Sequence, residues 1–249
     1  MQNSHATFEF DSWEPRPERC KLTAQEIHVW RAYLDDENLI LPHLQETLST
    51  DEKARAGRFH FQRDRNHFAN TRGILRELLG RYLNRAPTHL EFDYGPRGKP
   101  TLRGEPSVQF NVSHSHGMAL LAFAIGRQLG VDVEQIRPFA GEKIAERYFS
   151  PQEVMELRRL PAILHDEGFF LCWTRKEAYI KAGGEGLHVP LKSFHVSLTP
   201  DEPARLETSD RLDWTLRSLR PASQYVGAVV AEGKGWNLRG WHWTPPTHG

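Results

Sequence analysis

The chain has 249 residues, with 32 basic and 32 acidic side chains and no net formal charge. This length can hold one large domain or two small ones, each with a buried core. The balanced charge argues against a dedicated nucleic-acid-binding protein, which needs a basic excess to contact phosphates, and two cysteines are too few for a disulfide framework or a cysteine-rich metal site.

Membrane insertion and export are also disfavoured. The longest uninterrupted apolar run, residues 118–125, is too short to cross a bilayer. The first residues lack the basic stretch and following apolar stretch that a secretory signal needs. We therefore expect a cytoplasmic protein that binds neither membranes nor nucleic acid.

Hydrophobic spacing and capping signals predict a first series of elements. An irregular lead-in is followed by a strand over 26–34 and a helix over 39–48. Ser49 and Glu52 form a capping box, with serine at N-cap and glutamate at N3, that begins a helix running to about residue 59. A longer helix over 63–82 follows, and then strands over 89–92, 108–112, 118–125 and 129–134, the last two joined by residues 126–128 as a hairpin.

A second series repeats this plan. Ser150 and Glu153 form another capping box, with Pro151 at the first helical position. After that helix we expect a loop over 161–168, a long helix over 169–182 ended by Gly183 and Gly184, and strands over 193–198, 212–219 and 224–231. The chain is therefore predicted to be an α+β fold made of two similar halves, residues 1–128 and 129–249.

Two acidic segments carry the strongest chemical signal. Over residues 130–134, Asp132 and Glu134 alternate with valines, so both carboxylates should share one face of a strand. On the helix over 173–181, Trp173, Glu177 and Lys181 stand at i, i+4 and i+8 along one side. Three carboxylates with a lysine one turn beyond suit Mg²⁺ that is shared with a phosphate-bearing substrate. The plain alternatives are a solvated strand end and a salt-bridged helix surface.

Basic residues gather between positions 53 and 76, where Asp64 is the single acid. This positive face is either a phosphate-binding wall or an ordinary solvated helix surface. Arg97, Gly98 and Lys99 lie in a tight turn, where the glycine lets the backbone approach a ligand and the two cations can clamp an anion.

Polar residues follow the predicted strand over 108–112. Asn111, Ser113 and His114 fall where the sheet gives way to a loop. A hydrolase triad built on Ser113 and His114 is disfavoured, because the strand-to-helix nucleophile elbow is missing. A metal clip of His114 and His116 is disfavoured as well, because no third histidine or cysteine follows at a telling spacing.

Taken in order, these segments resemble the 4'-phosphopantetheinyl transferases of the surfactin-synthetase-activating (Sfp) type. The resemblance runs from about residue 48 to residue 196. Each motif is a modest signal, whereas the ordered set is highly specific. The motifs are Ser49-x-x-Glu52, Arg58-Phe59, Asp64-Arg65, Gly98-Lys99-Pro100, Phe110-Asn111-Val112-Ser113-His114, Gly130-Val131-Asp132-Val133-Glu134, Phe149-Ser150-x-x-Glu153 and Trp173-Thr174-Arg175-Lys176-Glu177-Ala178-x-x-Lys181.

The resemblance implies a pseudo-twofold pair of α+β halves with coenzyme A bound in the cleft between them. It also implies a reaction, in which the phosphopantetheine arm of coenzyme A moves to a serine hydroxyl of an apo acyl or peptidyl carrier protein and adenosine 3',5'-bisphosphate is released. The class of carrier stays open, and the duplicated fold suggests a monomer.

By the same resemblance, Asp132, Glu134 and Glu177 ligate Mg²⁺, and Glu177 is also the candidate acceptor of the serine proton, directly or through a water. Lys181 should hold the pyrophosphate and stabilise the developing charge as a second catalytic residue. The remaining contacts to coenzyme A should come from Arg63, Arg97, Gly98, Lys99, Pro100, Asn111, Ser113 and His114, with Lys53 and Arg55 as further candidates.

Glu52 departs from the pattern, because some relatives place a basic coenzyme-binding residue on that helix, and His116 has no assigned role. Two rivals remain. A non-catalytic binding module is disfavoured because all three carboxylates and Lys181 are present. A nucleotide-phosphate hydrolase is disfavoured because the chain has no Gly-x-x-x-x-Gly-Lys-Ser/Thr loop. Segment 150–170, which includes Met155 and Leu164, is expected to contact the carrier.

Overall fold

The structure is a computed structural model that describes residues 10–18, 20–35, 42–95, 98–184 and 189–245. None of the helices in these ranges is long and apolar enough to span a membrane. The helices are α1 (Pro42–Glu46), α2 (Thr50–Ala56), α3 (Gln62–Leu83), α4 (Glu142–Tyr148), α5 (Pro151–Arg159) and α6 (His165–Gly183). The strands are β1 (Glu26–Tyr33), β2 (Phe92–Tyr94), β3 (Pro100–Leu102), β4 (Val108–Ser115), β5 (Met118–Ile125), β6 (Leu129–Gln135), β7 (His195–Val196), β8 (Leu206–Glu207), β9 (Trp214–Ala222), β10 (Tyr225–Glu232) and β11 (Asn237–His242).

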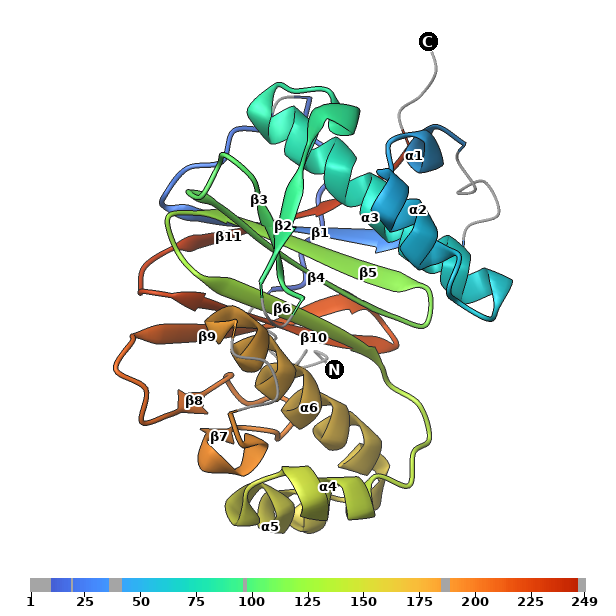
Figure 1. The fold of residues 1–249 in the computed structure, drawn as a ribbon. Helices are drawn as coiled ribbons and strands as arrows, with labels where there is room; N and C mark the ends of the chain where they lie inside the picture. The colour runs from blue at the N-terminus through green and yellow to red at the C-terminus, as the bar shows by residue number, and fades with distance from the viewer. Residues whose placement is uncertain (1–9, 19, 36–41, 96–97, 185–188, 246–249) are drawn as a thin grey trace.

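The two halves of the chain repeat one topology. The first runs β1, α3, the two-stranded sheet β2–β3, β4 and β5, and the second runs β6, α6, the two-stranded sheet β7–β8, β9 and β10. The main strands pair as β1–β5–β4 in one half and as β6–β10–β9 in the other. Figure 1 shows α3 against one sheet and α6 against the other. The predicted α+β fold with two similar halves is confirmed.

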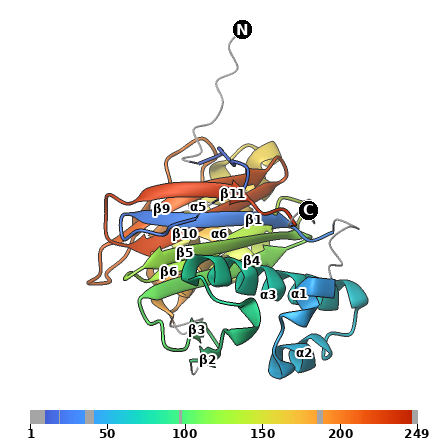
Figure 2. The ribbon, with the colours of Figure 1, turned by 90° about the horizontal axis from the view of Figure 1, so that it is seen from above.

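The C-terminal strand crosses back to the first half. β11 pairs in parallel with β1, with Ile27 opposite Leu238 and Trp30 opposite Trp241. No strand is predicted there from the sequence, although apolar and polar residues alternate over 236–239 and, after Gly240, over 241–243. Seen from above, α1, α2 and α3 lie together on one side of the β11–β1–β5–β4 sheet (Figure 2). The division at residues 128 and 129 stays a prediction.

One predicted connection is wrong. Residues 126–128 do not join β5 and β6 in a hairpin, because both edges of β5 are already hydrogen-bonded, to β1 and to β4. β6 pairs with β10 instead. Some boundaries also differ: β2 lies at Phe92–Tyr94 because a 3-10 turn occupies Pro87–His89, and β4 continues to Ser115.

Both predicted capping boxes form, and each places a glutamate in a buried ion pair. The Glu52 carboxylate accepts from the backbone of its N-cap serine and lies 2.6 Å from Arg76 of α3. The Glu153 carboxylate does the same for its own N-cap serine and lies 2.7 Å from Lys176 of α6. Each cation also donates to two backbone carbonyls beyond its own helix. Glu52, the departure from the family pattern, is therefore a structural residue in this protein.

Candidate active site

β4, β6 and α6 meet where the two halves join (Figure 1). α6 lies so close to β6 at Gly130 that a Cβ atom there would sit 2.1 Å from the carbonyl oxygen of Ala178. Only glycine permits that approach. Asn111 ties β4 to β6, since its Oδ1 accepts a hydrogen bond from the backbone N–H of Val131 at 2.9 Å. Polar side chains of all three elements are thereby brought together.

Lys181 and Ser113 hold Asp132 at the centre of this junction. Lys181 Nζ donates to Asp132 Oδ1 at 2.5 Å and to Ser113 Oγ at 3.0 Å. Ser113 Oγ donates to the same Oδ1 at 2.6 Å. Asp132 is 4% exposed, and its other oxygen, Oδ2, is buried without a partner among the described residues. A buried carboxylate oxygen without a partner is costly, so this position favours an additional cation.

Glu134 and Glu177 complete the group of three carboxylates. Glu134 Oε2 accepts from Ser115 Oγ at 2.6 Å. Burial raises the pKa of Glu134, and the charge of Asp132 adds to the rise. Burial also raises the pKa of Glu177, followed by the charges of Asp132 and then Glu134. Mutual repulsion of this kind is what a divalent cation relieves.

The donor chemistry of this group fits Mg²⁺, which prefers carboxylate oxygens. Within the described ranges, no three acidic, histidine or cysteine side chains lie close enough to hold a metal ion as they stand. Lys181 and two serines occupy carboxylate oxygens instead. The unpartnered Oδ2 of Asp132 is the oxygen left open to a metal ion. A site formed by Asp132, Glu134 and Glu177 stays a prediction.

A cavity of about 340 Å³ opens beside this group, between α3, the β2–β3 hairpin, β4 and the end of α6. Its basic wall includes Arg55 and Arg72. Many of the predicted coenzyme A contacts line it, namely Gly98, Lys99, Pro100, Asn111, His114 and Lys181.

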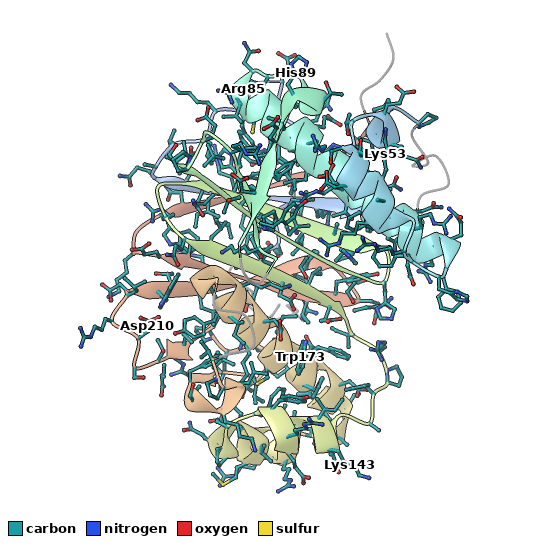
Figure 3. The ribbon with its side chains drawn as sticks, viewed as in Figure 1. Lys53, Arg85, His89, Lys143, Trp173 and Asp210 are labelled. Atoms are coloured by element: carbon teal, nitrogen blue, oxygen red, sulfur yellow. The ribbon has the colours of Figure 1, made fainter. Side chains whose placement is uncertain are left out.

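Other predicted contacts lie elsewhere. Arg63 is 60% exposed and pairs with Asp35 at 2.7 Å, and it is not among the residues that line the cavity. Ser113 contacts Asp132 and Lys181 rather than the cavity. Arg97 lies outside the described residues, and Lys53 is exposed on α2 (Figure 3).

Lys99 has a different environment from the one expected of a phosphate ligand. Its Nζ donates to the backbone carbonyl oxygens of Lys181 at 2.7 Å, Ala182 at 3.2 Å and Leu129 at 3.3 Å. Burial lowers the pKa of Lys99 to about 8. In this structure the amine caps the end of α6.

Some residues of the site are missed by reasoning from the sequence. Ser115, which holds Glu134, stands two positions after Ser113 on β4, so the two-residue period of a strand is a signal that can find it. Arg72 donates to the hydroxyl of Tyr94 at 2.8 Å and both line the cavity. No local pattern links those two, because they come from a helix and a hairpin.

Comparisons with known proteins cover most of the chain. Residues 128–230 match the family model of the 4'-phosphopantetheinyl transferase superfamily, and residues 30–125 match that of the 4'-phosphopantetheinyl transferase N-terminal region. The chain is 43% identical over 236 residues to the 4'-phosphopantetheinyl transferase HetI of Nostoc sp., over 93% of this chain and 98% of that protein.

The chain is also 29% identical over 184 residues to the 4'-phosphopantetheinyl transferase Sfp of Bacillus subtilis, over 74% of this chain and 80% of that protein. A solved holo-(acyl-carrier-protein) synthase from Bacillus anthracis aligns with a TM-score of 0.38 and 22% identity, over 42% of this chain and 94% of that one. From its family models and its relatives, the chain belongs to the 4'-phosphopantetheinyl transferase superfamily.

Proposed function

We propose that this transferase moves the 4'-phosphopantetheine group of coenzyme A to a serine hydroxyl of an apo carrier protein, using Mg²⁺ held by Asp132, Glu134 and Glu177. The convergence of these carboxylates with Lys181 beside the cavity carries the proposal. Bound magnesium would neutralise charge on the pyrophosphate oxygens. Adenosine 3',5'-bisphosphate is the other product. Both halves of one chain contribute to the site, which supports a monomer, and we expect it to act in the cytoplasm.

Glu177 is proposed to accept the proton of the serine hydroxyl, directly or through a water. In the metal-free protein, burial and the neighbouring Asp132 and Glu134 raise the pKa of Glu177, so this carboxylate readily takes up a proton. It lies on α6 one helical turn before Lys181, so the proton acceptor and the cation share one rigid element.

Lys181 is proposed to stabilise the pyrophosphate of coenzyme A. Its side chain is 28% exposed and lines the cavity, while its Nζ is held by Asp132 and Ser113. The amine is thus already oriented at the edge of the coenzyme site. A fixed positive charge there stabilises the negative charge that develops on the leaving group.

The remaining phosphates and the ribose are proposed to meet the cavity wall. Arg55 and His114 line it together with Gly98, where a Cβ atom would meet nothing within 4 Å. Arg63 and Arg97 stay predicted contacts.

The carrier is proposed to dock on the segment 150–170. Met155 of α5 is 51% exposed and Ile163, in the turn before α6, is 89% exposed. A carrier that buries these side chains gains apolar contact area. Ile163→Glu should therefore raise the KM for the carrier about tenfold or more and leave the KM for coenzyme A unchanged. Leu212→Glu, at an exposed leucine near the start of β9, is the control, and equal carrier KM values in both variants would refute the docking surface.

The metal-site assignment is tested by Glu177→Ala. We expect turnover to fall at least about 100-fold, because a metal ligand and proton acceptor are both lost. The thermal midpoint should not fall, since Glu177 is only half-buried and is repelled by its acidic neighbours. Glu207→Ala, at an exposed glutamate of β8, is the matched control. Unchanged turnover in Glu177→Ala would remove the role assigned to this residue.

A further inference from the structure

Lys99 connects the two halves of the molecule at the rim of the cavity. It immediately precedes β3, in the hairpin that the first half contributes, but its amine lies on the second half. Its acceptors belong to the two elements that carry the predicted metal ligands, because Leu129 begins β6 and Lys181 and Ala182 lie in the last turn of α6. Figure 1 shows the β2–β3 hairpin reaching from the α3 side toward β6 and α6.

The carbonyls that Lys99 contacts are of a kind that needs a partner. The last carbonyl oxygens of an α-helix have no N–H donors within the helix, and the C-terminus carries a partial negative charge. An ammonium group has three N–H donors. At Lys99 all three are matched by carbonyl oxygens, at 2.7, 3.2 and 3.3 Å. No donor is left for a phosphate while these bonds stand.

We propose that Lys99 is a positioning residue, which fixes the last turn of α6 and thereby the placement of Lys181 opposite Asp132, rather than a direct ligand of a coenzyme A phosphate. Lys99 bonds the backbone of the same residue whose side chain contacts Asp132 at 2.5 Å. This inference rests on the proposed function, in which Lys181 stabilises the pyrophosphate. Displacing a catalytic group by about 1 Å can cost roughly 100-fold in rate.

Amide hydrogen exchange tests the clamp without any turnover. In Lys99→Met, free of coenzyme A and metal, exchange should be faster in the last turn of α6 and in the β2–β3 hairpin. Lys99→Arg should restore part of the protection. Arg55→Met is the matched control, because Arg55 lines the same cavity and lies over the Phe68 ring at 5.3 Å, so α6 exchange should not change. Unchanged exchange in Lys99→Met would overturn the inference.

Turnover with coenzyme A and with dephospho-coenzyme A, which lacks the 3'-phosphate, separates positioning from direct phosphate binding. Lys99→Met should lower kcat about 10- to 100-fold with both co-substrates. The ratio of their kcat/KM values should stay that of the wild type. Collapse of that ratio would identify Lys99 as a direct 3'-phosphate ligand. Should Lys99→Met fail to fold, Lys99→Gln, which keeps a donor, serves in both experiments.

A double variant asks whether Lys99 acts through Lys181. Lys99→Met combined with Lys181→Met should turn over no more slowly than Lys181→Met alone, because the positioned group is already gone. Losses that multiply would overturn the inference. Absence of transfer by the wild type would refute the proposed function, and the exchange measurement would still decide whether Lys99 clamps α6.

Discussion

Cations that look alike in the sequence have different surroundings in the structure. Arg76 and Lys176 are buried beside a glutamate and have further carbonyl acceptors. Lys181 is 28% exposed at the rim of a cavity. A buried cation with a full set of partners stabilises the fold, because removing one partner leaves the other charge buried without compensation. A cation at a cavity rim can exchange its protein partners for a phosphate.

His28 predicts how stability depends on pH. Its ring is buried and lies 2.9 Å from the hydroxyl of Tyr82, and burial lowers the pKa of His28 to about 4. Between pH 6.5 and 4 the unfolded chain therefore binds a proton that the folded chain does not, so stability is lost as the pH falls through this window. The loss at this site amounts to at most about 3 kcal/mol.

Urea unfolding at pH 7 and pH 5 measures this effect. The free energy of unfolding should fall toward pH 5 in the wild type and fall less in His28→Asn. Equal pH dependence of the unfolding free energy in the two proteins would show that protonation of His28 does not cause the loss of stability.

Each half of the molecule is held by one capped helix tied to its long helix. α2 is joined to α3 by Glu52 and Arg76, and α5 is joined to α6 by Glu153 and Lys176. The two capping boxes are among the motifs that carry the family resemblance. Because the same ion pair forms in both halves, we infer that these two motifs stabilise the fold.

Breaking one of these ion pairs should lower the free energy of unfolding strongly. Glu153→Ala leaves Lys176 buried beside an empty position, and we expect a loss of about 3–5 kcal/mol in the free energy of unfolding. Ser150→Ala, which removes the N-cap side chain that Glu153 N–H donates to, should cost only about 1 kcal/mol. Chemical denaturation checks both values, and equal losses would show that the cap rather than the ion pair dominates.

Elements with local signals are those that the sequence predicts well. β5 lies at its predicted bounds because its run of apolar residues is unbroken, and the capping serines 49 and 150 begin α2 and α5 as expected. The β5–β6 hairpin fails because strand pairing depends on which edges are free, which a short connection does not reveal. In the same way, the motif Gly98-Lys99-Pro100 indicates that Lys99 is near a site. It does not reveal that the Lys99 amine bonds backbone carbonyls of α6.

Across the whole molecule, each half has its own apolar cluster and a third cluster joins the two halves. An apolar cluster contains Ile27 and Leu120 of the first half with Val131 and Val229 of the second. β11 adds a strand from the end of the chain to the first sheet. Separate unfolding of the two halves would expose this common surface. We therefore expect a single cooperative transition.

Gly240→Val tests this coupling. A Cβ atom at Gly240 would lie 2.2 Å from the ring of Phe10, so either this ring or β11 would have to move. The thermal midpoint should fall, and unfolding should remain a single transition with the same midpoint by tryptophan fluorescence and by far-ultraviolet circular dichroism. Two separated transitions would indicate that the halves unfold independently.

The measurement that tests the central claim most directly is intact-mass spectrometry of a mixed panel of apo carrier proteins incubated with the enzyme, coenzyme A and Mg²⁺. We predict that at least one carrier gains the mass of a single phosphopantetheine group, and that a chelator, Glu177→Ala in the enzyme or Ser→Ala in the carrier abolishes the gain. Unmodified carriers throughout, with coenzyme A binding intact, would contradict the proposal and favour a binding module.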